Sequence, residues 1–252
     1  MIMATRIRHS GITAARALCF GRNFGRYMRE DPKPVRPQKI EEDKTLKKLK
    51  EAWNVAASQV RGYGRIDIAY GIIFGTIKDI EYTARDVEKF SIVIAEFQNQ
   101  GFFYIQAGLF LSALINNGTD TEYTIQTKHL EKWWISKLGY RNTKIISVNG
   151  SIGSYLGNEM NGGKITVWGN VGGGTGYEMY AGEIKVWGNA DDETGVYMKG
   201  GKIIVEGNVA GSHLGSGMRG GEIYINGDQC EVRDLWLDHG RIYHKGKLIL
   251  DK

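Results

Sequence analysis

The sequence predicts a mainly β protein: a parallel β-helix with turns of about 19 residues, preceded by a small N-terminal α or α+β domain. Three observations predict this fold. Glycine is abundant, at 35 of 252 residues, while proline is scarce at 3, which favours a repeated backbone geometry over a flexible linker. Methionines recur at a fixed step, and the same step spaces glycines and aliphatic residues. A fixed period of this length is typical of a repeat architecture.

The repeat occupies the second half of the chain. Residues 157–190 contain nearly the same unit twice, in the stretch "GNEMNGGKITVWGNVGGGTGYEMYAGEIKVWGNA". The alternating I-x-V segment predicts a short strand whose Ile and Val face inward. Flanking glycines allow sharp corners, because glycine adopts positive φ readily. The recurring positions are Met160, Met179, Met198 and Met218; Gly150, Gly169, Gly188, Gly207 and Gly227; Ile146, Ile165, Ile184, Ile203 and Ile223; and Val148, Val167, Val186, Val205 and Ile225.

Two polar columns support the stacking of one unit on the next. The residue before each inward Ile alternates in charge, and opposite charges attract when parallel strands place them side by side. This column predicts the register of the strands. A second column of amide and acid side chains is expected to hydrogen-bond along the axis of the coil. The charged column is Lys164, Glu183, Lys202, Glu222 and Arg241, and the second is Asn170, Asn189, Asn208 and Asp228.

Both ends of the repeat depart from the unit. Leu237, Gly240, Ile242 and Gly246 continue the register, but His244 replaces the inward Val, so we expect a capping turn there. At the other end, "HLEKWWISKLGYRN" over residues 129–142 interrupts the pattern before Ile146. We expect this segment to form the opposite cap.

The sequence divides into a basic arm over 1–42, a mostly helical domain over 43–121, and the glycine-rich β-helix with its caps over 122–252. Helical spacing recurs within 44–60, and Thr83 with Asp86 predicts a capping box at the start of 83–97. The apolar run 101–118 predicts a buried helix, since it is shorter than the roughly 20 residues of a membrane span. Residues 64–82 alternate more like strands. The apolar positions of the first helix are Leu46, Leu49, Trp53, Ala56 and Val60.

The arm is strongly basic while the rest of the chain is nearly neutral. Residues 1–36 contain seven Arg and one Lys against Glu30 and Asp31, which is +6, so the formal total of +5 leaves −1 elsewhere. We expect a flexible arm, and its composition suits a disordered surface segment, docking to an acidic protein, an organelle transit peptide, or a nucleic-acid contact. The arm lacks the interleaved aromatic residues on which proteins stack the bases of single-stranded nucleic acid, and this disfavours a nucleic-acid contact. With two cysteines and no secretory signal, we expect a reducing compartment, the cytoplasm.

No motif in the sequence predicts a catalytic, cofactor-binding or metal-binding residue. The run "GGGTG" at 172–176 lacks the G-K-[ST] and the following helix of a phosphate loop. The cysteines lack a C-x-x-C partner, and the five histidines lack zinc spacing. Asp191, Asp192 and Glu193 lie one turn from His213, a combination that could hold a divalent metal. We interpret this cluster as a solvated loop, because the recurring Asp of a calcium repeat is absent.

Trp168 and Trp187 are the most specific interaction feature. They occupy consecutive outward positions beside the inward valines. Trp is enriched at protein interfaces. The two residues are therefore predicted to form a docking face, covered either by the N-terminal domain or by another chain.

The repeat unit, G-N-E-M-N-G-G-K-I-T-V-W-G-N with three near copies over residues 144–228, resembles the GXGXG domain. That domain is found at the C-terminus of glutamate synthase large subunits and as one of the subunits of formylmethanofuran dehydrogenases. The resemblance implies a right-handed β-helix with a structural role, packed against catalytic domains or subunits of an oxidoreductase complex. It implies no flavin, cluster or metal in the coil itself. Residues 1–120 resemble neither the glutamate synthases nor the formylmethanofuran dehydrogenases.

Three functions follow as hypotheses. The first is a non-catalytic scaffold or accessory subunit that binds a protein partner or forms a homo-oligomer, with no cofactor of its own. The second is a detached GXGXG subunit of a split glutamate synthase or of a formylmethanofuran dehydrogenase-type enzyme. The third is a β-helix enzyme with its site between the coil and the N-terminal domain.

Overall fold

The computed structural model describes residues 40–60, 65–130, 135–211, 213–230 and 239–251. The chain divides into two units, residues 1–38 and 39–252, and the second unit is described below. The basic arm expected over 1–42 lies almost wholly outside the described residues. Of the helices that the structure describes, none is long and apolar enough to cross a membrane.

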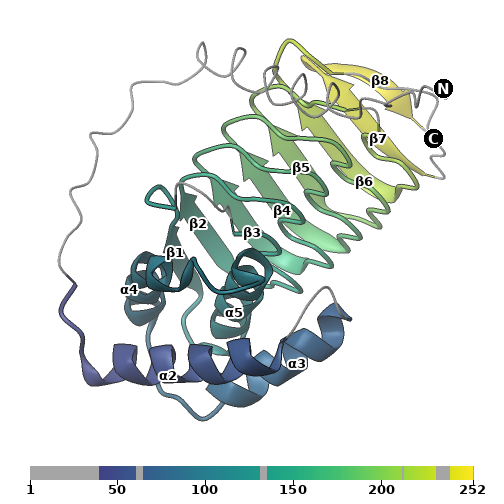
Figure 1. The fold of residues 1–252 in the computed structure, drawn as a ribbon. Coiled ribbons are helices and arrows are strands. Elements are labelled where there is room, and N and C mark those ends of the chain that lie inside the picture. The colour runs from purple at the N-terminus through teal and green to yellow at the C-terminus, as the bar shows by residue number, and fades with distance from the viewer. Residues whose placement is uncertain (1–39, 61–64, 131–134, 212, 231–238, 252) are drawn as a thin grey trace, which may run out of the picture. The chain divides into compact units, whose positions relative to one another are not determined.

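In the described part of the chain, four helices precede the coil (Figure 1). They are α2 (Lys44–Gln59), α3 (Ile66–Ile77), α4 (Ala84–Val93), which continues into the short 3₁₀ helix η2 (Ile94–Phe97), and α5 (Phe103–Asn117). The helices predicted within 44–60, 83–97 and 101–118 are therefore confirmed. All of the apolar positions named for the first helix are buried.

The starts of α2 and α4 follow from local sequence. Asp43 Oδ1 accepts a hydrogen bond of 2.8 Å from the backbone N–H of Leu46, which satisfies one of the free donors at the helix start. The predicted capping box at Thr83 and Asp86 is formed by both reciprocal bonds. The buried faces of these helices meet around Trp53, whose ring packs edge-on against Phe110 at 5.4 Å between centroids.

From residue 65, where the structure describes it, the segment 64–82 does not form the predicted strands, since α3 occupies most of it. Its two glycines, Gly71 and Gly75, each cost about 1 kcal/mol in a helix, which is why the local pattern favours a strand. Helical spacing places Ile73 and Ile77 on one side, and both are fully buried. Burial of this side against the other helices outweighs the local preference.

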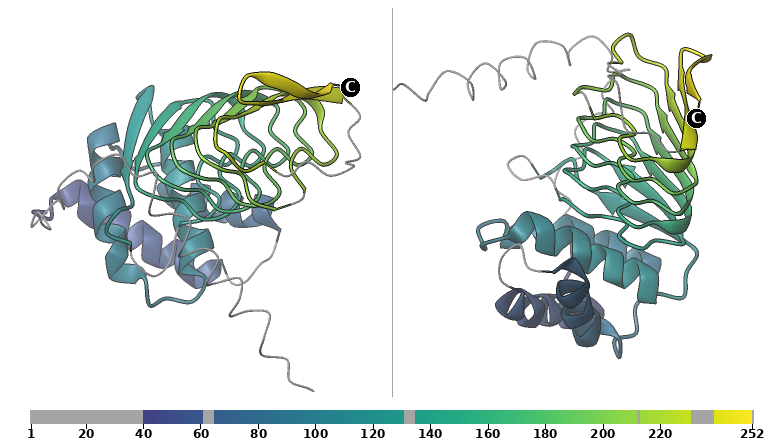
Figure 2. Two further views of the ribbon diagram at one scale, coloured as in Figure 1. Left: turned by 90° about the horizontal axis from the view of Figure 1, so that it is seen from above. Right: turned by 90° about the vertical axis from the view of Figure 1, so that its right-hand side faces the viewer.

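The coil is a parallel β-solenoid of about six turns of about 19 residues, spanning 122–244. One sheet contains all eight strands in chain order, with β1 to β7 parallel and β8 antiparallel to β7. Figure 2 shows the turns stacked behind one another. The strands are β1 (Glu122–Gln126), β2 (Ile145–Asn149), β3 (Asn161–Val167), β4 (Ala181–Val186), β5 (Lys202–Val205), β6 (Arg219–Ile225), β7 (His239–His244) and β8 (Lys247–Asp251).

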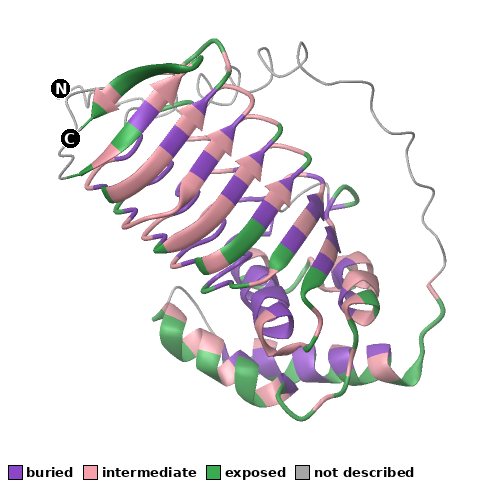
Figure 3. Ribbon diagram, turned by 180° about the vertical axis from the view of Figure 1, so that it is seen from behind, coloured by how far each residue is buried: buried purple, intermediate pink, exposed green. Residues whose placement is uncertain are grey.

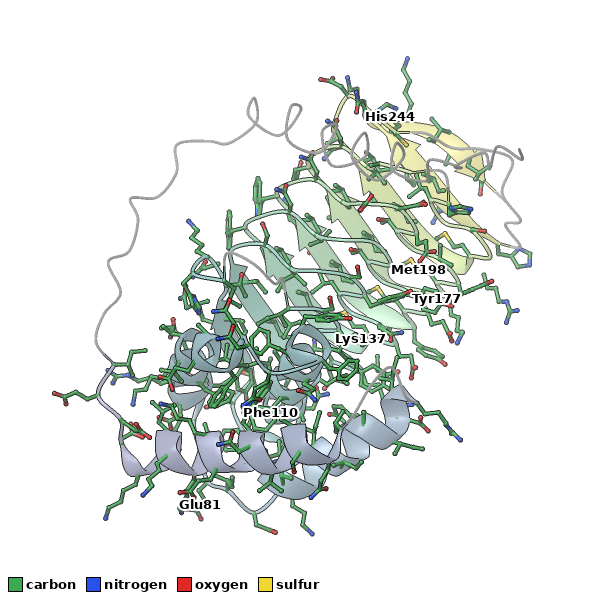
Figure 4. All side chains as sticks on the ribbon, viewed as in Figure 1. Glu81, Phe110, Lys137, Tyr177, Met198 and His244 are labelled. Carbon is green, nitrogen blue, oxygen red and sulfur yellow. The ribbon has the colours of Figure 1, made fainter. Side chains whose placement is uncertain are left out.

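The predicted register is confirmed strand by strand. Ile165 pairs with Ile184 and Val167 with Val186, and the same columns run through the neighbouring strands. These Ile and Val side chains are fully buried, which gives the strands their alternating bands in Figure 3. The four predicted methionines are also fully buried, and Met198 lies within the coil in Figure 4. Stacked identical side chains thus form the core of the coil.

Segment 129–142 does not cap the coil, contrary to the prediction. The coil begins one turn earlier, at β1, which pairs in parallel with β2. Where this segment is described, it completes the first turn: the N–H of Gly157 donates to Leu138 O at 2.8 Å. The larger and more aromatic sequence of the first turn hides the repeat because this turn must also pack against the helices.

Helices α4 and α5 cover the open end of the coil instead. Ser91 Oγ on α4 accepts a 2.9 Å bond from Gln126 N at the edge of β1. Ser112 Oγ on α5 accepts from the backbone N–H groups of Gly139 at 2.9 Å and Tyr140 at 3.3 Å. Helix α5 is buried along most of its length. Its side chains close the coil and continue the core into the helices.

The opposite end closes as a hairpin. Ile242 stacks on Ile223 as predicted, and His244 takes the place of the inward Val beside Ile225. The His244 ring nitrogen Nε2 lies 2.8 Å from Gly227 O, so a polar contact ends the apolar column. Strand β8 then folds back on β7, which turns the last parallel strand into an internal one.

The asparagine column bonds along the axis, but not from side chain to side chain. Asn170 Oδ1 accepts from Asn189 N at 2.8 Å, and Asn189 Oδ1 accepts from Asn208 N at 2.6 Å. Asn208 Oδ1 accepts in turn from Gln229 N at 2.9 Å. Each side chain therefore satisfies a backbone donor of the next turn at a corner where the strand ladder has ended.

Replacing Ser112 with alanine should destabilise the protein by about 1–3 kcal/mol, because buried N–H groups of Gly139 and Tyr140 lose their acceptor. Chemical denaturation measures the loss. Ser58→Ala on α2 is the control, since Ser58 is exposed, and it should change stability by less than about 0.5 kcal/mol. Equal effects of the two substitutions would contradict the role given to Ser112.

Candidate interaction surface

Trp168 and Trp187 lie side by side on the outer face of the sheet, directly after β3 and β4. Their rings are stacked, with 5.1 Å between centroids and 6° between planes. Their exposed fractions are 54% and 42%. The predicted adjacency is confirmed, and the described helices leave both rings open to solvent.

Polar groups hold one flank of the tryptophan pair. Lys185 Nζ lies 4.1 Å from the centroid of the Trp187 ring, a cation–π contact, and 2.7 Å from Glu206 Oε1. The hydrogen bond from Lys185, with a further one from Asn226, lowers the pKa of Glu206 despite its partial burial. This flank is already paired within the chain, so the open area of the pair is its apolar ring surface.

The charged column lies on the same outer face. At β3 and β4 its residue precedes the tryptophan by four positions (168 − 164 and 187 − 183). The register places its members on consecutive strands in the predicted order. Lys164 Nζ is 2.9 Å from Glu183 Oε1, and Arg241 is 2.6 Å from Glu222 Oε1. Exposed pairs of this kind contribute about 0–1 kcal/mol each. Their regular alternation defines the electrostatic pattern of the face.

Aromatic residues also occupy the outer face at its far end. Tyr224 and Tyr243 stack with 4.5 Å between centroids and 3° between planes. Lys202 Nζ lies 4.5 Å from the centroid of the Tyr224 ring. The Tyr224 hydroxyl donates to Glu222 Oε2 at 2.8 Å, and this bond raises the pKa of Tyr224 to about 12. The face therefore combines stacked rings with alternating charges.

The acidic cluster contains a hydrogen-bonded pair, Asp192 and His213. His213 Nδ1 lies 3.0 Å from Asp192 Oδ2, and His213 N donates to Asp192 Oδ1 at 2.9 Å. Asp191 Oδ1 accepts from Asp192 N, and Asp192 Oδ1 accepts from Glu193 N, each at 2.9 Å. Within the described ranges, no group of three or more His, Cys, Asp or Glu side chains is placed to hold a metal ion. The carboxylates order the loop.

The pairing of Asp192 predicts a pH effect on stability. Burial alone raises the pKa of Asp192, but the bonds from His213 and Glu193 outweigh it and lower that pKa below the 3.8 of the free side chain. A lowered pKa stabilises the fold above pH 3.8, and this contribution is lost as the pH falls through the folded-state value. Asp192→Asn should therefore lower the melting temperature at pH 7.

The gap in melting temperature between wild type and Asp192→Asn should close as the pH falls below 3.8. Thermal unfolding followed by circular dichroism at several pH values measures it. A gap that stays constant with pH would mean that the Asp192 charge does not contribute to the fold.

The glycine run 172–176 is part of the scaffold, as predicted. The N–H groups of Gly172, Gly174 and Gly176 donate to the carbonyls of Ile152, Asp192 and Leu156 on neighbouring turns, at 2.8–3.0 Å. These donors are used within the coil, whereas a phosphate loop points its N–H groups at the ligand. Gly174 and Gly176 also have positive φ, at 73° and 69°, as expected for corner positions.

A tyrosine strip on the corner side of the coil was not predicted from the sequence. Tyr155, Tyr177 and Tyr197 come from three successive turns, with centroids 5.6 Å and 5.5 Å apart and rings nearly perpendicular. They occupy three different positions of the repeat unit, because their spacings are 22 and 20 residues (177 − 155 and 197 − 177). The fixed period of the repeat therefore does not align them. Their clustering is visible only once the turns are stacked.

Lys137 lies at the end of this strip. Its Nζ is 4.0 Å from the centroid of the Tyr155 ring, and burial lowers the pKa of Lys137 to about 8, against an opposing effect of Glu159. Tyr177 and Lys137 both lie on the corner side of the coil in Figure 4. Lys137 and the tyrosine strip together form a surface of aromatic rings and one amine next to the helices.

The contact between α5 and the first turn is filled by protein atoms. A Cβ added at Gly108 would clash with the backbone carbonyl of Ser136, and Tyr104 O accepts a 2.8 Å bond from Ser136 N. Burial raises the pKa of the Cys230 thiol to about 11, which favours the protonated thiol over the thiolate at neutral pH. Cys19 lies outside the described residues.

The chain matches no protein-family model and no curated protein sequence. The β-solenoid is therefore established by the strand register alone, and the likeness to GXGXG domains stays a resemblance of the repeat unit.

Proposed function

We propose that this protein is a non-catalytic scaffold or accessory subunit, and that it docks another protein chain through the outer face of its sheet at Trp168 and Trp187. The observation that supports the proposal is the stacked, exposed tryptophan pair. An indole can bury about 150–250 Å², and large aromatics at the centre of an interface commonly dominate its binding energy.

The rest of the coil supports a structural role. Its interior columns are aliphatic and fully buried, its glycine N–H groups are used between turns, and its acidic cluster is paired with His213. A stack of this kind presents a rigid face to a partner. These features are more typical of a structural scaffold than of a substrate-binding protein.

The repeat unit supports a narrower form of the proposal. Its likeness to GXGXG domains suggests a detached subunit of a split glutamate synthase or of a formylmethanofuran dehydrogenase-type complex. In that case the partner is a catalytic subunit of an oxidoreductase, and the coil shapes the complex without binding its cofactors.

The double substitution Trp168→Ser and Trp187→Ser tests the proposal. Tagged full-length wild type is purified from its native cells after cross-linking, and each co-purifying chain is identified and rebound in purified form. Binding should be lost with the double variant. It should persist with Tyr180→Ser and Tyr197→Ser, which removes two rings of similar exposure, 46% and 47%, away from the tryptophans.

Folding must be unchanged for this comparison to count, which circular dichroism checks. If oligomeric state, protease resistance and partner binding all stay the same in the tryptophan variant, the pair is ordinary surface and the proposal is wrong.

A further inference from the structure

We infer that the outer face of the sheet pairs with the same face of a second copy of this chain, about a two-fold axis that runs parallel to the strands and between β3 and β4. The inference rests on the proposed docking role of the Trp168–Trp187 face and names its occupant. It follows from the order of charges on the face together with the place of the tryptophans.

The charged column is complementary to itself when its order is reversed. A two-fold axis parallel to the strands keeps each column opposite itself and reverses the order of the turns. With the axis between two strands, Lys164 faces Glu183 of the second copy, and Glu183 faces its Lys164. With the axis along a strand, residues of the same charge face each other, since Glu183 would face Glu183 of the second copy. Only an axis between strands brings opposite charges together, because the signs alternate at every turn.

The tryptophans select the axis between β3 and β4. This axis sets Trp168 against Trp187 of the second copy, which gathers four indole rings into one apolar cluster. An axis between β4 and β5 would set Trp187 against Glu206, a carboxylate already paired with Lys185 at 2.7 Å. Covering that carboxylate with an indole removes water from a charge without adding a partner. The apolar match favours the first axis.

Three further contacts of this arrangement are compatible with it. Ile145, which is 40% exposed, faces the Lys202 stem of the second copy, and Asn149 faces Glu206. Glu122 faces Glu222 at the rim, where Glu222 is neutralised by Arg241 at 2.6 Å and salt screens the repulsion.

The size of the face predicts a weak dimer. Six strands about 4.8 Å apart, each with about five residues rising about 3.3 Å, cover about 24 Å by about 16 Å. That footprint is smaller than the roughly 800 Å² per partner of a standard interface. We therefore expect a micromolar dissociation constant that rises with salt concentration.

Two charge variants that complement each other test the inference. Glu183→Lys leaves two lysines, at 164 and 183, and Lys164→Glu leaves two glutamates. Each breaks the same ion pair within the chain. Glu183→Lys also lies beside Lys202, whereas Lys164→Glu lies beside Ile145, so the folding of each variant is checked by circular dichroism. Sedimentation velocity at low salt should show a dimer for wild type and association weakened at least about tenfold for each variant alone. An equimolar mixture should restore the dimer as a heterodimer.

The control is Arg141→Glu, which breaks an ion pair of 2.8 Å with Glu159 away from the outer face. It should dimerise like wild type. A monomeric wild type at high micromolar concentration, or a mixture that fails to associate, would overturn the inference. Association of Glu183→Lys with Lys202→Glu in place of Lys164→Glu would overturn the axis between β3 and β4.

The proposed docking role can survive this failure. If the charge mixture stays monomeric while the tryptophan double variant still loses a purified, different partner, the face docks another protein and the second copy is excluded. If both tests fail, the face is not an interface.

Discussion

Replacing Gly182 with alanine should destabilise the protein by about 2–6 kcal/mol. Gly182 has φ +97°, and a Cβ there would lie 2.7 Å from Gly162 C and from Gly163 O of the preceding turn. A strained backbone position costs about 1–3 kcal/mol for a residue with a side chain. Overpacking against backbone adds about 1–3 kcal/mol, and the neighbouring turn cannot move without disturbing the stack.

Gly162→Ala is the matched control one turn earlier. No atom lies within 4 Å of a Cβ built at Gly162, so this substitution should change stability by less than about 1 kcal/mol. Chemical denaturation of both variants measures the difference. If both lose the same small amount, the corners of the coil tolerate side chains, and the positions of the glycines do not determine the turns.

Replacing Met179 with alanine should cost about 2–5 kcal/mol, the range for large-to-small changes in a core. Met179 is fully buried, and its Cε comes within 2.7 Å of where a Cβ would lie on Gly201 of the next turn. Met198 stands in the same relation to Gly221, also at 2.7 Å. Each methionine thus fills the space left by the missing side chain of a glycine one turn on.

Met179→Leu keeps most of the volume and should lose less than about 1.5 kcal/mol. Urea titration with an unchanged m-value would show that both variants unfold from the same native state. A loss below about 0.5 kcal/mol for Met179→Ala would place the methionine column outside the core and contradict the register.

The pairing of Met179 with Gly201, and of Met198 with Gly221, explains why the unit repeats so closely along the chain. A corner needs a residue that tolerates positive φ, and the absence of its Cβ opens a space that the flexible methionine occupies. Methionine and glycine recur at the same step, since these successive turns meet the same two requirements.

The coil could be predicted from local sequence. A strand alternates sides with every residue, so the I-x-V segments identify their inward positions, and the fixed step identifies the stacking partner of each residue. Trp168 and Trp187 follow from the same argument. Helices α2, α4 and α5 were predictable for a similar reason, because caps and apolar spacing are local signals.

The remaining features depend on contacts between distant parts of the chain. Segment 66–77 is a helix because its apolar side is buried against other helices, which overrides the two glycines within it. The first turn lacks the repeat pattern since it also contacts α5, and its membership of the coil is shown by the parallel pairing of β1 with β2. The tyrosine strip of Tyr155, Tyr177 and Tyr197 joins unlike positions of successive units. Such features depend on which surfaces meet, and local sequence periodicity does not specify that.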